Sequence, residues 1–272
     1  QQSQGSLAAA DRWIPDPESL VVRAEEHGIP QARHRVFILG VREDLRVSPA
    51  LIQRAAPVTL EDVIGDLPLL RSTLSREEDS LEAWRQAVSG VRSQAWFTEP
   101  QTRNLQTAAR EARKALADVD RSTLGRGHTW LPNSGRPAAL GRWYRSDGCG
   151  LTNHEARGHM ASDLHRYFFA ACFARAHGRS PTLEDFPLEL LPEHRNAEQG
   201  RNGAMFVDRF RVQLPDRAST TITSHISKDG HYFIHPDPAQ CRSLTVREAA
   251  RLQTFPDSYH FAFIRAQYMP WL

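Results

Sequence analysis

Apolar positions follow two kinds of spacing along the chain, and each kind predicts a different element. The continuous run over residues 36–41, Val-Phe-Ile-Leu-Gly-Val, is closed by three charged residues. It predicts a strand covered on both faces of an α/β sheet. A shorter run at residues 20–24 predicts a second strand. Over residues 75–120 apolar side chains recur at helical spacing among acidic and basic ones, which predicts amphipathic helices.

Capping residues indicate where further helices begin and end. Thr59 precedes an acidic first turn and predicts a helix that starts at residue 60. Thr245 has Glu248 three residues later, which is the spacing of a capping box, and predicts a helix through residue 252.

A longer helix and a hairpin are predicted in the second half of the chain. We expect the helix to be capped by Ser162 or Asp163 and to end at Gly178. Two short runs of β-branched and aromatic residues flank an Asp-Gly pair within residues 219–235, which predicts two strands joined by a turn.

Composition narrows the class of protein. The chain has 272 residues, 40% hydrophobic and 24% charged, which is close to globular averages and sufficient for a full core. No apolar run approaches the ~20 residues that a membrane span needs. Three cysteines argue against a disulfide framework. We expect a soluble, cytoplasmic protein without a membrane segment.

The basic residues are almost all arginines, although the net charge is only +2. Only Lys114 and Lys228 are lysines, and a GC-rich genome would explain much of this bias. Arginine also suits bidentate contacts to phosphate and guanine, so the distribution of the arginines matters more than their number. Residues 121–150 combine several arginines with one acid, Asp147, and three large aromatic residues; these arginines are Arg121, Arg126, Arg136, Arg142 and Arg145.

Metal and nucleotide motifs are weak or missing. His154 and His159 are spaced too widely for a helical zinc site, so ordinary hydrogen-bonding roles are favoured. The three cysteines form no paired ligand spacing, and the chain contains no glycine-rich dinucleotide loop or Walker loop. We therefore expect no metal site and identify no cofactor-binding residues.

Two longer segments carry more information. Residues 28–35 have the order Gly-Ile-Pro-Gln-x-Arg-x-Arg, which places Arg33 and Arg35 on the same side of a strand entrance. Residues 244–257 have the order Leu-Thr-x-Arg-Glu-x-Ala-Arg-Leu-Gln-x-Phe-Pro-Asp. Taken alone, the first would be a pair of solvated arginines and the second a capped helix with surface arginines.

Together these segments closely resemble two motifs of the DNA cytosine-5 methyltransferases, in the order that this family has them. Bacterial members also resemble the chain at residues 152–157, at residues 208–211 and through the predicted hairpin. The likeness covers residues 21–70 and 150–262.

The resemblance implies an α/β fold in three parts. Residues 1–56 would be the end of a Rossmann-like catalytic domain, residues 57–240 a mixed α+β target-recognition domain, and residues 241–272 a helix returning to the catalytic domain. The implied function is sequence-specific transfer of methyl from S-adenosyl-L-methionine to C5 of a flipped cytosine in double-stranded DNA, as in bacterial restriction–modification.

Departures from the family pattern change this expectation. None of the three cysteines follows a proline, as the family's nucleophile does, and its Glu-Asn-Val motif and glycine-rich cofactor loop are missing. Gln267-Tyr268 is not followed by the family's final motif, and the chain opens without methionine. We expect a C-terminal portion that is inactive alone and is completed by a catalytic half, which could be a separate chain. The alternative is a non-enzymatic DNA-binding module derived from the family.

The resemblance also implies residue roles. Arg35 would be the cation near O2 of the target cytosine, with Arg33 and Gln31 shaping the pocket wall. Thr221, followed by Ile222, matches a pair that touches a backbone phosphate, and the helix with Arg247 and Glu248 would organise the recognition domain. The expected DNA-binding residues are Arg126, Arg136, Arg142, Arg145, Arg209, Arg211, Thr221, Ser224 and Lys228. The sequence does not reveal the target site.

Overall fold

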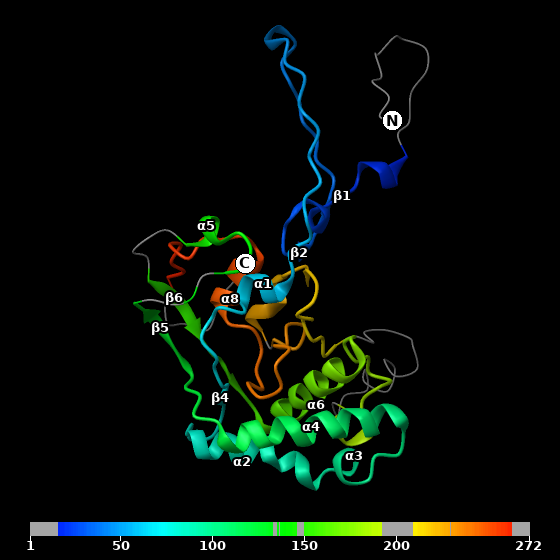
Figure 1. The fold of residues 1–272 in the computed structure, drawn as a ribbon, viewed down its shortest axis with the longest axis vertical. Helices are drawn as coiled ribbons and strands as arrows, with labels where there is room; N and C mark the ends of the chain where they lie inside the picture. Colours follow the sequence, from blue (N-terminus) through cyan, green and yellow to red (C-terminus); the bar gives the residue numbers. More distant parts are fainter. Residues whose placement is uncertain are drawn as a thin grey trace.

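A layer of helices forms one side of the body in the computed structural model (Figure 1). The layer consists of α2 (Leu81–Ser89), α3 (Ala95–Thr98), α4 (Arg103–Arg121) and α6 (Ala161–His177). The structure describes residues 16–132, 135, 137–145, 150–191, 209–228 and 230–262. The predictions for Arg136, Asp229 and residues 263–272 lie outside these ranges.

The helices of the layer form where the sequence predicts them. The Thr102 side chain caps α4 by accepting from the amide of Leu105, and the buried face of α4 is rich in alanine, which lets it pack closely against α6. Helix α6 ends at Gly178, whose φ of +64° is the left-handed conformation that glycine adopts readily. Its N-cap is Met160, two residues before the nearer predicted cap, and Asp163 lies in the first turn. None of the described helices is long and apolar enough to cross a membrane.

A second core lies between two short helices, α1 (Leu60–Ile64) and α8 (Val246–Leu252). Both predicted caps are confirmed. The Thr59 and Thr245 side chains accept from the third amide of their helices, and the Asp62 and Glu248 carboxylates accept from the amides of Thr59 and Thr245. Helix α8 is therefore packed within the body, against α1.

The described strands form four two-stranded sheets. Two are antiparallel: β1 (Val22–Arg23) with β3 (His34–Arg35), and β5 (Gly127–Leu131) with β6 (Leu151–Glu155). Two are parallel: β2 (Gln31–Ala32) with β8 (Ser219–Thr220), and β4 (Thr73–Leu74) with β7 (Gly158–His159). The remaining helical turns are α5 (Gly141–Tyr144), η1 (Pro17–Leu20), η2 (Ala24–His27), η3 (Glu43–Leu45), η4 (Gly90–Ser93), η5 (Leu188–Leu190) and η6 (Ser224–Ser227).

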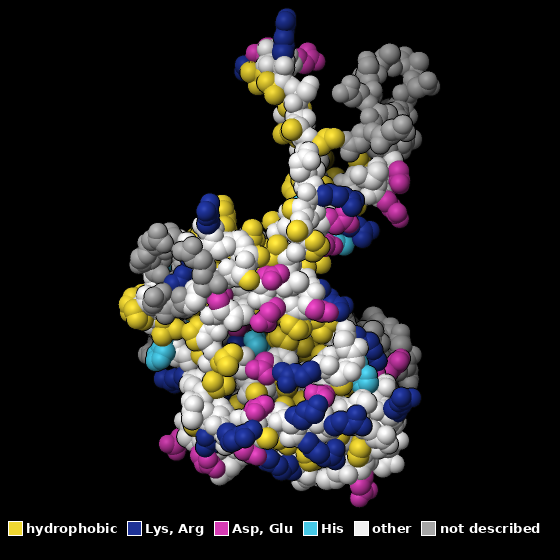
Figure 2. Space-filling model, in the orientation of Figure 1, with side chains coloured by type: hydrophobic (Ala, Val, Ile, Leu, Met, Phe, Trp, Pro, Cys, Tyr) yellow, Lys and Arg dark blue, Asp and Glu magenta, His cyan; other side chains and the backbone are white. Residues whose placement is uncertain are grey.

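The predicted buried strand over residues 36–41 does not form. Residues 36–52 instead leave the body as a two-legged arm, and hydrophobic side chains stand exposed along it (Figures 1 and 2). The Ile38 side chain is 96% exposed. A strand buried on both faces needs neighbouring strands and covering helices, and the described residues place none beside it. The second leg returns to η2, where the Ala55 amide donates to Glu26 O at 3.1 Å.

The predicted hairpin over residues 219–235 is also wrong. Ser219 and Thr220 pair with Gln31 and Ala32 of β2, which are distant in the sequence, instead of with residues 231–234. Ile234 makes isolated bridges to Val212 and Ser243. Long-range partners therefore replace the local pairing that the turn sequence suggested.

Candidate functional site

Gln31 lies at the junction between the arm and the body. Its side chain is only 2% exposed. Its Nε2 donates to Leu252 O at 3.0 Å, and its Oε1 accepts from the Ile222 amide at 3.3 Å. One side chain therefore joins three segments: the arm base, the end of α8 and the chain that follows β8.

The chain around β8 reinforces this junction. Thr221 Oγ1 donates to Ala32 O at 2.7 Å. The Ser219 amide and Oγ both donate to Pro30 O, at 3.0 and 3.1 Å. The structure thus brings together Gln31 and Thr221, which the sequence analysis expected to face the target base and a phosphate.

Arg33 and Arg35 lie at the base of the arm and are exposed. Both line an open hollow of about 450 Å³, whose other walls are mostly apolar and include Ile29 and Phe37. Arg35 Nη1 donates to His34 O at 2.6 Å. The hollow therefore presents two guanidinium groups beside apolar surface.

The basic stretch of residues 121–150 lies on a different part of the body, at the β5–β6 hairpin and α5 (Figure 1). Arg126 and Arg142 are exposed. Arg145 is only 9% exposed, and its Nη1 lies 3.8 Å from Asp257 Oδ2, so it faces the interior. Two indoles on this surface, those of Trp130 and Trp143, are more than half exposed.

The other expected DNA-binding residues surround η6 and the segment before β8. Arg209 and Arg211 are half-buried, whereas Ser224 and Lys228 are exposed. Arg157, whose role the sequence did not indicate, holds residues 226–228. Its guanidinium donates to Ile226 O at 2.6 Å, and to Ser227 O and Lys228 O at 3.0 Å.

Three buried arginines hold α8 in place, so the interpretation of this segment as a helix with surface arginines is wrong. Arg242 donates to both carboxylate oxygens of Glu248 at 2.7 Å. Burial raises the pKa of Glu248, but the Arg242 guanidinium outweighs it and holds this pKa well below its usual value.

The other two arginines connect α8 to its neighbours. Arg247 donates to Thr152 O on β6 at 2.8 Å and to Tyr259 O at 2.6 Å. Arg251 donates to Asp257 at 2.9 and 2.8 Å, to Val63 O at 2.8 Å and to Asp66. Helix α8 therefore ties β6, α1 and residues 257–259 to one another.

Asn153 is a further residue whose role the sequence did not indicate. Its side-chain amide bonds to the backbone of Phe261 as a neighbouring strand would: it donates to Phe261 O at 2.9 Å and accepts from the Phe261 amide at 3.0 Å. Its φ of +60° is a left-handed conformation that asparagine tolerates better than most residues. The only local signal is that tolerance, which does not identify a partner 108 residues away.

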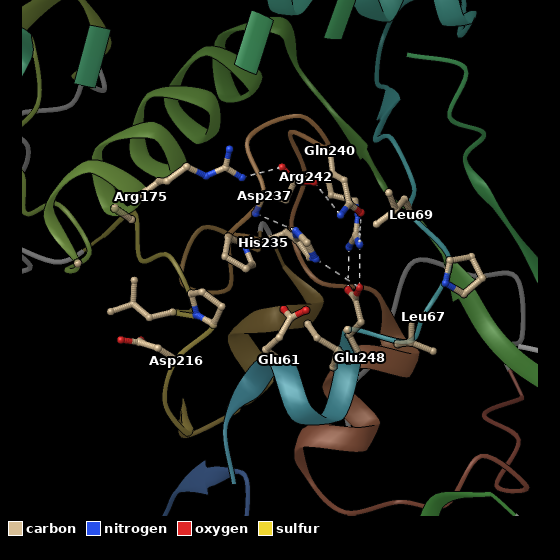
Figure 3. A pocket seen from close by; sticks show the side chains of 18 residues that line it. Glu61, Leu67, Leu69, Arg175, Asp216, His235, Asp237, Gln240, Arg242 and Glu248 are labelled. Carbon is tan, nitrogen blue, oxygen red and sulfur yellow. Dashed lines mark hydrogen bonds and ion pairs between the residues drawn. The ribbon is translucent and has the colours of Figure 1, made fainter. Parts of the chain in front are cut away.

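A cavity of about 440 Å³ lies between α1, the end of α6 and residues 235–242 (Figure 3). Most of the charged side chains that line it are paired with one another. Arg175 pairs with Asp237 at 3.0 Å, and His235 Nδ1 accepts from the Asp237 amide at 3.1 Å. Burial lowers the pKa of His235 to about 3, so its imidazole is neutral near pH 7. These contacts hold the 235–242 loop.

Cys172 and Cys241 are buried, and burial raises the pKa of each thiol. Both are therefore protonated at neutral pH and poor nucleophiles; Cys149 lies outside the described residues. His154 Nε2 bonds to Pro68 O at 2.8 Å, and His159 Nε2 bonds to Ser243 Oγ at 3.1 Å. Within the described part of the chain, no three His, Cys, Asp or Glu side chains are grouped to hold a metal ion.

Comparison with known proteins gives matches along most of the chain. The family profile of C-5 cytosine-specific DNA methylases matches residues 16–269. The type II methyltransferase M.Bpa9945I of Bacillus paralicheniformis is 33% identical over 259 residues, covering 93% of this chain and 46% of that protein. M.BbvI of Brevibacillus brevis is 24% identical over 255 residues, covering 94% and 44%. The chain thus spans less than half the length of either relative.

Proposed function

The chain belongs to the family of C-5 cytosine-specific DNA methylases, and we propose that it forms the DNA-recognition portion of a type II methyltransferase. The complete enzyme would methylate C5 of a flipped-out cytosine in double-stranded DNA, as part of a restriction–modification system. The mixed helix and strand content is consistent with an α/β methyltransferase fold.

The observation that carries this proposal is the parallel pairing of β2 with β8. It sets the segment with Arg33 and Arg35 directly beside Thr221, so that the residues we assign to the target base and to a backbone phosphate share one junction. Flipping a base costs a few kcal/mol, which backbone and pocket contacts must repay. The shared junction supports a site at which a base leaves the duplex.

Arg35 has the chemistry that the reaction needs on this side of the base. Addition of a nucleophile at C6 builds negative charge on the cytosine ring, and a fixed cation near O2 stabilises it. The nucleophile would come from the catalytic half, because no cysteine of the chain follows a proline and both described cysteines are buried thiols. Arg33 would form the adjoining pocket wall.

The hollow at the base of the arm does not fit S-adenosyl-L-methionine. Its two guanidinium groups would repel the sulfonium and ammonium of that cofactor, and no carboxylate lines it. We therefore assign cofactor binding to the catalytic half.

The arm is the surface we assign to that half. Contiguous exposed apolar side chains of this extent mark a protein–protein contact, and an extended segment joins a sheet through its free backbone groups. The catalytic half would be another part of the same protein or a separate chain.

We assign sequence reading to the exposed arginines near the hairpin. Arg126 and Arg142 are accessible for bidentate contact to guanine, each such contact giving ~1–3 kcal/mol of discrimination. Arg136 remains a prediction of the same kind, whereas the burial of Arg145 favours a structural role. Arg209, Arg211, Thr221, Ser224 and Lys228 would contact phosphate.

The test begins with duplex DNA titrated against the chain at several salt concentrations. We expect binding that weakens with salt, because phosphate contacts release counterions. Arg126→Ala and Arg142→Ala should relax preference at single base pairs, whereas Arg103→Ala, an exposed arginine of the helix layer, should not. Absence of DNA binding contradicts the proposal. DNA binding without 5-methylcytosine formation, after a catalytic half and labelled S-adenosyl-L-methionine are supplied, indicates the non-enzymatic module.

A further inference from the structure

We propose that Gln31 is a positioning residue that couples the β5–β6 hairpin to the segment bearing Arg33 and Arg35. The inference rests on the proposed function, because it concerns how recognition of a DNA sequence reaches the target-base pocket. It is carried by a continuous set of hydrogen bonds from the hairpin through α8 to the arm base.

The first link is the end of α8. The last four carbonyls of a helix have no partner within it and must be satisfied from outside. Leu252 is the last residue of α8, and the Gln31 amide donates to its carbonyl. The arm base is therefore attached to the end of a helix whose position is set elsewhere.

The second link joins α8 to the hairpin. The Arg247 guanidinium donates to both the carbonyl and the hydroxyl of Thr152, at 2.8 and 2.7 Å. Thr152 lies on β6 directly opposite Trp130 of β5, one of the exposed indoles. Arg247 is fully buried, so a shift of the hairpin must move either this guanidinium or the helix that carries it.

The third link leads from Gln31 to the arginines. The Arg33 amide donates to Gln31 O at 2.8 Å, and Arg33 O accepts from the Ala24 amide at 3.3 Å. Gln31 Oε1 also receives the Ile222 amide. The backbone that carries Arg33 and Arg35 is thus held by Gln31, whose side chain is bound to the end of α8.

Gln31 is suited to this role because both ends of one amide are used. The donor end contacts α8, and the acceptor end contacts the chain after β8. Substitution can separate the two. Gln31→Glu keeps an acceptor for Ile222 but loses the donor to Leu252, whereas Gln31→Met removes both at similar volume.

The experiment measures amide hydrogen exchange of the full chain, free and saturated with a duplex selected for binding to the wild type. In the wild type we expect DNA to slow exchange of residues 127–131 and of residues 31–35. In both Gln31 variants the slowing at residues 31–35 should fall about tenfold, the scale of one lost buried hydrogen bond. The slowing at residues 127–131 should stay within about threefold, because the β5–β6 pairing does not involve Gln31. Gln106→Met, at an exposed glutamine of α4, is the matched control.

Each outcome is decisive. Full slowing at residues 31–35 in folded Gln31→Glu overturns the coupling while leaving the proposed function intact. Failure of the wild type to bind any duplex overturns the proposed function and the inference with it. A second measurement uses the chain completed by its catalytic half. Gln31→Glu should there lower kcat on the selected duplex about tenfold with KM for DNA unchanged, and an unchanged kcat overturns the inference.

Discussion

Folded proteins usually bury apolar side chains and expose charged ones, and the arm and α8 each break one half of this rule. The arm exposes consecutive apolar residues, with Phe37 68% and Leu39 70% accessible. Helix α8 instead buries Arg247 and Arg251 completely. The buried arginines are bound to carboxylates and carbonyls within the body. The apolar side chains of the arm instead remain exposed.

This contrast separates two uses of one residue type. Arg251 is surrounded by acceptors of its own chain, so its charge serves the architecture. Arg35 stands exposed at the arm base, so its charge remains accessible from solvent. The environment of an arginine, more than its place in a motif, therefore indicates whether it supports the fold or the reaction.

The largest expected effect is that acid destabilises the body, whereas the arm has no buried histidine through which acid could act. Burial lowers the pKa of His159 and of His235 from 6.5 to about 3, and the arm contains no histidine. As the pH falls, these two imidazoles take up protons in the unfolded chain before they do so in the folded one. Their contribution to the free energy of unfolding is therefore fully present above pH 6.5 and is lost as the pH drops towards 3. The slope should be about 1.4 kcal/mol per pH unit for each imidazole.

Urea unfolding at several pH values measures this slope. His159→Phe should remove about one imidazole's share of it, and His128→Gln, on the exposed face of β5, should leave it unchanged. A slope identical in wild type and His159→Phe would contradict burial as its cause.

Arg251→Met tests the charge that supports the body. Removing one partner of a buried ion pair takes both Arg251 hydrogen bonds from the buried Asp257 carboxylate, so we expect a loss of about 3–5 kcal/mol in unfolding free energy. Thermal and urea unfolding give the value. Arg121→Met, an exposed arginine at the end of α4, is the control. Equal stabilities of the two variants would break the contrast drawn between buried and exposed arginines.

Arg35→Ala tests the charge that remains accessible. With the catalytic half present, turnover should fall ~10²–10³-fold, the usual cost of removing one donor to a developing oxyanion. Unfolding free energy and DNA affinity should hardly change, because Arg35 is exposed and the phosphate contacts are assigned to other residues. Single-turnover kinetics beside a DNA titration distinguish the cases. Lost affinity with normal turnover at saturating DNA would make Arg35 a positioning residue.

Ile38→Ser should have the smallest effect on the chain itself. This side chain is almost fully exposed, so its replacement should change unfolding free energy by no more than about 0.5 kcal/mol. Association with the catalytic half, measured by calorimetry, should weaken. A serine that destabilised the chain alone would show that the arm is packed in solution.

Features with local causes were predictable from the sequence. The N-cap at Thr59 and the capping box at Thr245 depend only on residues within one helical turn, and both form as expected. Gly178 ends α6 because glycine adopts the left-handed conformation without strain. The burial of Arg247 and Glu248 gives both residues a structural role, whereas the resemblance to the family is what links them to a recognition domain.

Features with distant causes were not predictable. The run at residues 36–41 has the composition of a buried strand, but a strand needs a neighbour that its own residues do not specify. The Asp-Gly turn suggested local pairing for Thr220, yet Thr220 pairs with Ala32. The amide of Gln31 reaches Leu252, 221 residues away, and no local pattern encodes that distance.

The arm also decides how the chain behaves while it is made and handled. Its legs expose apolar side chains together with unpaired backbone groups, which is the combination through which extended segments of different molecules join into aggregates. Expression of the chain by itself should therefore favour inclusion bodies and proteolytic nicking near residues 36–52, in proportion to its concentration. If the catalytic half covers this segment as we propose, its co-production should raise the yield of soluble material, and that yield would report assembly.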